Sequence, residues 1–388
     1  MIPYGRQHID ESDLAAVQEV LTSNWLTQGP QVPAFEQAVA DYCGVSYAVA
    51  VNSATSALHI ACLALGVGPG DRVWTSPNSF VASANCALYC GASVDFVDIE
   101  LQTGNMSVSC LAEKLQAAAK QNLLPKVVIP VHFAGQPCDM HQIAALAQQY
   151  GFKVIEDASH AIGARYQDHA VGGCHYSDIC VFSFHPVKII TSGEGGMATT
   201  QSAKLARAMQ MLRSHGITSE PAELTEPSHG VWYYQQHLLG FNYRLTDIQA
   251  ALGRSQMGKL EQFVTGRQQL AAFYDQALQK LAGVAPLSQQ AAGKSSYHLY
   301  VVRLTELSHS QHQSCVSYLR QHNVVGHVHY IPIYLQPYYQ QLGFRAGYCP
   351  QAELYYQQAV TLPLFPDLTA AQLQYVIQTL STFLQEQA

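Results

Sequence analysis

Short apolar runs rich in β-branched residues alternate with helix-like segments through the first 250 residues of the chain. This alternation predicts an α/β fold, in which a mostly parallel sheet carries helices on both faces. Ligands of such sheets gather at the carboxyl ends of the strands. The expected strands are residues 47–52, 72–77, 93–98, 126–133, 153–158, 178–184 and 196–200, and the expected helices include 56–66, 141–151 and 203–216.

The pattern changes after about residue 250. A long helical stretch, residues 246–282, leads to an expected strand at 298–304, further helices and the segment HVHYIP. A chain of 388 residues is long enough for two domains. We therefore expect a large α/β domain over residues 1–250 and a small C-terminal α+β domain over residues 251–388.

Composition excludes several classes of protein. The net charge is −7 and no basic run is present, which argues against nucleic acid or anionic lipid as a partner. The chain shows neither a signal peptide nor an apolar run of membrane-spanning length. Its ten cysteines form no CxxC pair and lie mostly in apolar surroundings, as expected for reduced thiols of a cytoplasmic protein. Only 12% of residues are charged, which is compatible with a large oligomer interface or with glutamines in place of charged residues.

The segment Gly66-Val-Gly-Pro-Gly70 resembles a dinucleotide-binding loop, but its context is reversed. It follows a helix and precedes a strand, whereas a nicotinamide site needs a strand before the glycines and a helix after them. We expect only a helix end and a turn.

The stretch VFSFHPVKIITSGEGG, residues 181–196, places Lys188 inside an apolar run. Burial lowers the pKa of a lysine and leaves a neutral, nucleophilic amine, so Lys188 is a candidate Schiff-base former. A lysine that reaches the surface from a strand end is an equally good interpretation of this segment alone.

Three further features of the chain bear on the role of Lys188. Residues 52–56 (NSATS) end a strand and open a helix, a typical anion site, although N-capping by Ser53 or Thr55 also explains them. Asp157 ends an expected strand, where it could keep a pyridine nitrogen protonated or serve as a structural acid. Ser183 could help hold a phosphate or cap a turn. Together with Lys188 these features supply what pyridoxal 5′-phosphate requires.

Longer motifs point to a family. The segments LTQGP, NSATSALH, PNSFVASANCALYCGA, VHFAGQ, EDASHAIGA, SFHPVKIITSGEGG, RSHGI and GFNYRLTDIQAALG span nearly the whole chain. In them the sequence resembles the sugar aminotransferases of the DegT/DnrJ/EryC1/StrS family. The resemblance implies the type I (aspartate-aminotransferase-like) fold, pyridoxal 5′-phosphate as cofactor, and transfer of an amino group from L-glutamate to a UDP-linked 4-keto-6-deoxy sugar.

The resemblance also implies roles for individual residues. Lys188 would form the Schiff base and Asp157 would contact the pyridine nitrogen. Asn242 would reach the phosphate in a neighbouring subunit, which makes a homodimer with shared active sites obligatory. His160 stands where many members have glutamine. The remaining expected cofactor contacts are Ala54, Thr55, Phe80 and Ser183.

The expected substrate contacts come from three segments, namely Tyr4; Asn24, Trp25, Leu26 and Thr27; and His327, Val328, His329 and Tyr330. For the third segment, the alternative is an ordinary strand of the small domain with His327 and His329 on its solvent-exposed face. No Asp, Glu or Cys lies near enough in sequence to complete a metal site with these histidines, so no metal is expected. Two other functions stay open at this point: transfer to a different keto sugar nucleotide, and a non-catalytic cofactor-binding regulator.

Overall fold

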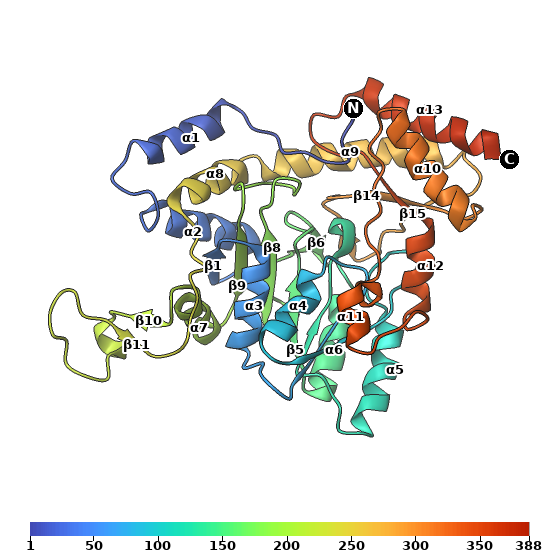
Figure 1. Ribbon diagram of the computed structural model, residues 1–388. Coiled ribbons are helices and arrows are strands. Elements are labelled where there is room, and N and C mark those ends of the chain that lie inside the picture. Colours follow the sequence, from blue (N-terminus) through green and yellow to red (C-terminus); the bar gives the residue numbers. More distant parts are fainter. Residues whose placement is uncertain (388) are drawn as a thin grey trace.

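A computed structural model describes residues 1–387 and shows a seven-stranded central sheet (Figure 1). Strand β9 runs antiparallel to both of its neighbours, and all other adjacent pairs are parallel. The predicted mostly parallel α/β sheet is thereby confirmed. In spatial order the strands are β1 (Tyr47–Val51), β9 (Gly196–Thr200), β8 (Ile179–Ser183), β5 (Lys153–Asp157), β4 (Val127–Ile129), β2 (Arg72–Thr75) and β3 (Ser93–Phe96).

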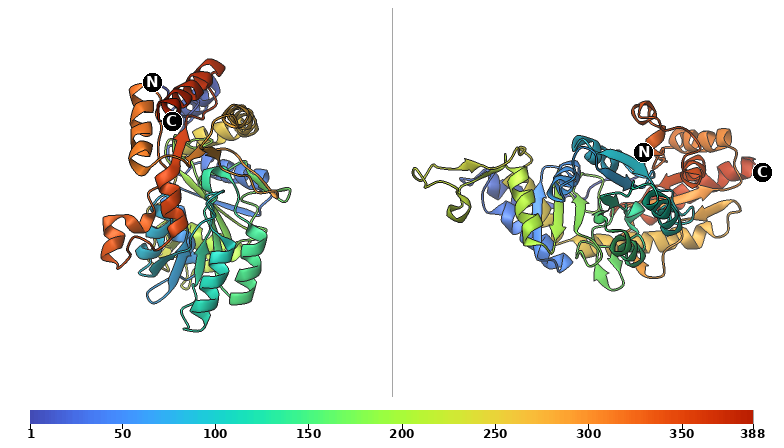
Figure 2. Two further views of the ribbon diagram at one scale, coloured as in Figure 1. Left: turned by 90° about the vertical axis from the view of Figure 1, so that its right-hand side faces the viewer. Right: turned by 90° about the horizontal axis from the view of Figure 1, so that it is seen from below.

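Alternate residues of each strand face opposite layers of helices. In β1, Val49 and Val51 join one apolar core, whereas Ala48 and Ala50 join another on the opposite face. The first face is covered by α3 (Ala54–Ala64), α4 (Ala82–Tyr89) and α7 (Ala203–Arg213). The second face is covered by α2 (Gln31–Cys43), α5 (Val108–Ala119), α6 (Met140–Tyr150) and α8 (Asp247–Met257) (Figures 1 and 2).

Two expected elements differ from the structure. The strand expected over 126–133 ends at Ile129, because Pro130 has no N–H for the ladder, and the chain turns through a 3-10 segment, η1 (Phe133–Gly135). The helix expected over 246–282 is two helices, α8 and α9 (Leu260–Leu278), separated at residues 258–259. The glycine segment at 66–70 is the predicted helix end and turn, with Gly66 and Gly70 at positive φ.

The C-terminal part forms a second, smaller sheet of β12 (Val284–Pro286), β14 (Tyr300–Leu304) and β15 (Ala359–Leu362), all antiparallel. It packs with α9, α10 (His309–Gln321) and α13 (Ala370–Gln387) around a core of its own. In contrast, η3 (Ile333–Leu335), α11 (Pro337–Gln341) and α12 (Pro350–Gln358) pack against the large sheet, where the ring of Tyr334 lies 5.8 Å from that of Phe96. The domain boundary at residue 250 stays a prediction.

The remaining elements lie around this frame. Helix α1 (Glu11–Leu21) packs on α8. A hairpin of β10 (Ile217–Thr218) and β11 (Gln235–Gln236), with η2 (Pro221–Glu223) between its strands, projects from the body (Figures 1 and 2). A small sheet joins β6 (Arg165–Tyr166), β7 (His169–Ala170) and β13 (Gly293–Lys294). Within residues 1–387, no helix combines the length and apolarity that crossing a bilayer requires.

Candidate active site

Asp157 is the last residue of β5, and hydrogen bonds fix the position of its carboxylate. The residue is buried, and its Oδ2 accepts a hydrogen bond of 2.6 Å from the hydroxyl of Ser83 on α4. Its Oδ1 accepts the amide N–H of Ser159 at 3.1 Å. One hydroxyl and one amide thus fix the carboxylate at the strand end, where ligands of such sheets gather.

Lys188 lies in the loop between β8 and β9. The loop is closed at its base by hydrogen bonds between Phe184 and two residues, Ser192 and Gly195. Burial disfavours the ammonium ion and lowers the pKa of Lys188 to about 8, although the attraction of Asp157 acts in the opposite direction. The amine is therefore partly neutral near neutral pH, as a nucleophile requires.

The first turn of α3 lies against the start of β9. Ser53 is the N-cap and accepts the amide N–H of Ser56, so Ala54 and Thr55 carry first-turn amides that the helix does not use. A Cβ on Gly196 would lie 2.5 Å from the Ala54 nitrogen. Gly196 also pairs with Ser183, the last residue of β8, so these groups meet at one edge of the sheet.

This donor set fits pyridoxal 5′-phosphate. The two amides at the α3 N-terminus, with the hydroxyls of Thr55 and Ser183, suit a phosphate. The fixed carboxylate of Asp157 suits a pyridinium nitrogen, and the amine of Lys188 suits an aldehyde carbon. The close approach of Gly196 to α3 leaves no room there for a larger residue.

Aromatic and imidazole rings from distant segments of the chain lie near the end of the sheet that carries Asp157 and Ser183. The N-terminal segment is bound to the small unit by the hydrogen bond from the Ile2 N–H to the Asn323 carbonyl. This places the ring of Tyr4 5.3 Å from that of His327 and 5.1 Å from that of His329. The Tyr330 hydroxyl lies 3.3 Å from Nε2 of His160.

The positive charge of Lys188 affects the pKa of two of these imidazole rings. Burial, followed by the positive charge of Lys188, lowers the pKa of His160 well below the usual range. Burial also lowers the pKa of His329 well below the usual range, followed by the charges of His327 and then Lys188. The structure thus brings together Lys188, Asp157, His160, Tyr4, His327, His329 and Tyr330.

The alternative strand interpretation of residues 327–330 is wrong. His327 makes only an isolated bridge to Thr361, and His329 is 4% exposed, with Nδ1 2.8 Å from the hydroxyl of Thr361. His329 is buried because its segment runs between the large sheet and the small C-terminal sheet and does not lie on a solvent-exposed face of either sheet. Val328 lies between the two histidines in the sequence, and its carbonyl oxygen lies 3.2 Å from Nδ1 of His327.

Other expected site residues lie apart from this group in the single chain. Asn24, Trp25, Leu26 and Thr27 are exposed, and the Leu26 carbonyl accepts the amide of Asp247. Thr27 lines a cavity of about 390 Å³ with Arg213 and Arg244, and this cavity shares no lining residue with the Lys188 group. Asn242 is exposed beside Ser214. Phe80 is 61% exposed, three residues before the Ser83 that contacts Asp157.

Sequence reasoning missed three residues at the site. Ser83 binds Asp157, Asn78 accepts the amide N–H of Tyr330 at 3.1 Å, and the His298 ring lies 4.4 Å from that of His160. Each contact joins residues at least 74 positions apart. No local pattern marks them, although Asn78 and Ser83 lie inside a segment that carried the family resemblance.

The fold, with a lysine, a strand-end aspartate and a helix N-terminus at one sheet edge, is that of the pyridoxal-phosphate-dependent aminotransferases. The chain belongs to the DegT/DnrJ/EryC1/StrS aminotransferase family, whose sequence profile matches residues 7–381. It is therefore a sugar aminotransferase that uses pyridoxal 5′-phosphate, which confirms the predicted family, fold, enzyme class and cofactor.

Three similar proteins cover nearly the full chain. The spore coat polysaccharide biosynthesis protein SpsC of Bacillus subtilis is 37% identical over 97% of this chain and 95% of its own. The UDP-4-amino-4,6-dideoxy-N-acetyl-beta-L-altrosamine transaminase of Campylobacter jejuni serotype O:23/36 is 35% identical over 100% of this chain and 98% of its own. The structure of Helicobacter pylori PseC, an aminotransferase of pseudaminic acid biosynthesis, superposes with a TM-score of 0.90 at 30% identity, covering 99% of both chains.

Proposed function

We propose that this enzyme transfers an amino group from L-glutamate to C4 of a UDP-linked 4-keto-6-deoxy-N-acetylhexosamine. The product would be UDP-4-amino-4,6-dideoxy-N-acetyl-beta-L-altrosamine, an intermediate of pseudaminic acid biosynthesis. Support comes from the full-length similarity to the Campylobacter transaminase and to PseC. The observation that carries the proposal is the grouping of Tyr4, His327, His329 and Tyr330 around Lys188, because these are the residues expected to hold the sugar nucleotide.

Bound pyridoxal 5′-phosphate supplies an electron-withdrawing ring that carries the amino group between the two substrates. In the proposed mechanism, the Ala54 and Thr55 amides and the Thr55 and Ser183 hydroxyls hold its phosphate. Asp157 would keep the ring nitrogen protonated, and Phe80 would stack on the ring. The amine of Lys188 would hold the cofactor at its aldehyde carbon, and the free amine would move the proton from the substrate Cα as general base and then acid.

A second copy of the chain completes each site in this proposal. Asn242, exposed on one copy, would reach the phosphate held by the other, and residues 24–27 would line the other copy's sugar site. Exposed apolar residues on the projecting hairpin and beyond it, Val231, Trp232 and Leu239, support a covered face of this kind. The homodimer and a cytoplasmic location stay predictions, the latter resting on the free cysteines.

The visible spectrum of the purified protein tests the proposal first. We expect the absorbance of lysine-bound cofactor, lost on addition of L-glutamate and regained on addition of the UDP-linked 4-keto sugar. The Lys188→Ala variant should lack this absorbance, whereas the exposed-lysine control Lys280→Ala should retain it. NMR of the aminated product would give the stereochemistry at C4.

Each other outcome points elsewhere. If the absorbance returns only with another keto sugar nucleotide, that compound is the acceptor and the proposed one is wrong. Cofactor that binds but never responds to amino donors would favour the non-catalytic regulator.

A further inference from the structure

The loop after β4 reaches directly to His160. Ala134 has a φ of +58°, a left-handed conformation that is uncommon for a residue with a side chain, and its amide N–H donates to Nδ1 of His160 at 3.3 Å. The approach is close, since a Cβ on Gly135 would lie 2.9 Å from the His160 carbonyl oxygen and 2.7 Å from the Ser296 hydroxyl. The amide of Ala134 therefore meets the imidazole at a position that the backbone sets.

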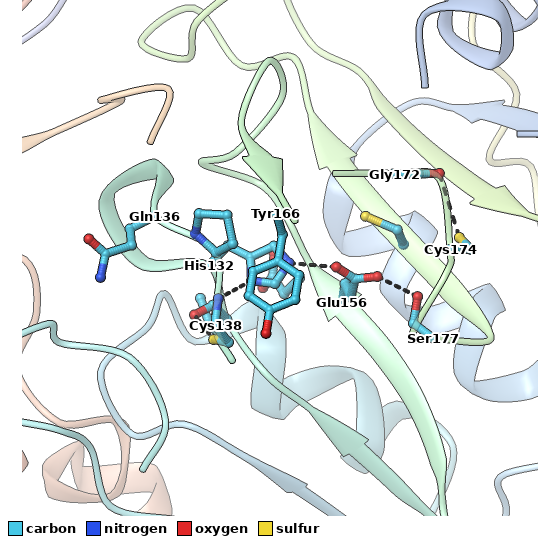
Figure 3. Close-up of polar contacts among 12 residues, drawn as sticks. His132, Gln136, Cys138, Glu156, Tyr166, Gly172, Cys174 and Ser177 are labelled. Atoms are coloured by element: carbon cyan, nitrogen blue, oxygen red, sulfur yellow. Dashed lines mark hydrogen bonds and ion pairs between the residues drawn. The ribbon is translucent and has the colours of Figure 1, made fainter. Parts of the chain in front are cut away.

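A buried polar network anchors this loop at both ends (Figure 3). At its start, Nε2 of His132 lies 2.7 Å from Oε2 of Glu156, and the other carboxylate oxygen, Oε1, accepts the hydroxyl of Ser177. At its end, the amide N–H of Cys138 donates to Nδ1 of His132 at 3.1 Å. Figure 3 shows Glu156 between His132 and Ser177, with Cys138 beside His132. The loop that carries Ala134 is thus held by buried hydrogen bonds on both sides.

The amide of Ala134 determines the tautomer of His160. An amide nitrogen is only a donor, so Nδ1 must present its lone pair and the ring proton of a neutral His160 must be on Nε2. The charged and titratable groups facing the ring are Lys188, His298, His329 and Tyr330. Burial of the ring, and then the positive charge of Lys188, lowers the pKa of His160 and so favours the neutral imidazole.

The tautomer in turn orients the Tyr330 hydroxyl. Because Nε2 carries the proton, His160 donates to the Tyr330 oxygen across the 3.3 Å contact, and Tyr330 cannot donate back. The tyrosine backbone is held separately, by its amide N–H to Asn78. Among residues 1–387, His160 is the one hydrogen-bond partner found for this hydroxyl. The hydroxyl's own proton must therefore point away from His160.

We propose that Tyr330 is an oriented hydrogen-bond donor to a substrate oxygen, and that His160 is the positioning residue that aims it. The inference deepens the proposed function and rests on it for the identity of the substrates. The acceptor is a carbonyl, hydroxyl or carboxylate oxygen, which either the keto sugar or the amino donor could supply. Glutamine at position 160 would serve equally, because an amide side chain also offers one acceptor and one donor.

The tautomer is tested without any assay of activity. Isotope-edited NMR of the histidine ring nitrogens in the holoenzyme, with His160 assigned from the signal lost in His160→Gln, should show a lone pair on Nδ1 and a proton on Nε2. The pattern should not change between about pH 6 and about pH 8. The reversed tautomer, or an imidazolium ion in this range, would overturn the inference whatever the substrates prove to be.

Half-reaction kinetics test the role of Tyr330. Tyr330→Phe and His160→Leu should each lower kcat/KM of the same half-reaction by about tenfold, the usual effect of one lost hydrogen bond to a substrate. The double variant should lose no more than either single variant, because the two residues act as one unit. His160→Gln should recover most of the activity lost in His160→Leu.

The affected half-reaction identifies the source of the oxygen. Loss confined to the step with L-glutamate assigns it to the donor carboxylate, and loss confined to the step with the UDP-keto sugar assigns it to the sugar. Additive losses, or a His160→Gln variant as slow as His160→Leu, would contradict the inference. If the wild-type enzyme does not turn over the UDP-keto sugar, the proposed function fails, while the NMR pattern and the glutamate step still decide this inference.

Discussion

At the scale of single residues, Lys188 shows how position alone changes chemistry. Its loop lies between two buried strands, and burial lowers the pKa of its amine to about 8, against the attraction of Asp157. The other eight lysines of the chain lie in polar or surface contexts. A difference of two to three pKa units corresponds to roughly 3–4 kcal/mol between protonation states, enough to decide which lysine reacts.

The lowered pKa predicts the pH dependence of cofactor uptake. Only the neutral amine reacts, so the rate at which apoprotein captures pyridoxal 5′-phosphate should rise about tenfold per pH unit below pH 8 and level off above it. Stopped-flow absorbance would measure this, with Lys188→Ala showing no covalent phase and Lys280→Ala behaving as wild type. A rate that still rises steeply above about pH 9.5 would mean that Lys188 has the pKa of an ordinary lysine.

Ser83 supplies a second residue-scale prediction. Its hydroxyl donates to the Asp157 carboxylate at 2.6 Å, so Ser83→Ala should leave that oxygen unpaired and the carboxylate less firmly placed. A hydrogen bond to a charged group contributes about 1.5–3 kcal/mol, so we expect kcat to fall by about tenfold or more with little change in KM. The exposed Ser314→Ala is the matched control. Equal kcat in both variants would show that Ser83 does not support Asp157.

At the scale of elements, the contact between α3 and β9 builds the proposed phosphate site. The two are joined where Gly196 meets the backbone of Ser53 and Ala54, and an added Cβ would lie 2.4 Å from the Ser53 carbonyl carbon. Backbone atoms cannot move aside as a flexible side chain would.

Gly196→Ala should therefore displace the first turn of α3. We expect the Kd for pyridoxal 5′-phosphate to rise by at least about tenfold, since the helix amides would no longer converge on the phosphate. Gly68→Ala is the control, because nothing lies within 4 Å of a Cβ there. Equilibrium dialysis against the cofactor, with thermal unfolding measured in parallel, would separate lost binding from lost stability. An unchanged Kd would rule out this contact as the support of the phosphate site.

At the scale of the whole molecule, the site is assembled from parts that are far apart in sequence. The N-terminal segment brings Tyr4, the large sheet brings Asp157 and Lys188, and the segment before η3 brings His329 and Tyr330. Helices α11 and α12, although late in the chain, pack on the large sheet and so tie the two units together beside this site.

Shared sites in the proposed dimer lead to a mixing experiment. Lys188→Ala and Asn242→Ala should each be inactive, but a mixed dimer would combine the intact Lys188 of one copy with the intact Asn242 of the other. Random equal mixing should then restore about a quarter of wild-type activity, because half the dimers are mixed and each has one complete site. Activity after co-refolding, with dimer content measured by sedimentation, checks this. No recovery in a mixture that does form dimers would place each site within one chain.

The sequence by itself determined the alternation of strands and helices, because burial on a sheet imposes a local period that short segments display. It also placed Asp157 and Ser183 at strand ends, and Lys188 in an apolar loop, for the same local reason. Only the tertiary structure decided that His329 is buried, and that Ser83, Ala134 and Asn78 contact residues of the candidate site. These outcomes depend on contacts between segments that are distant in the chain. A local sequence pattern can indicate that a side chain is buried, but it does not identify the residues that the side chain contacts.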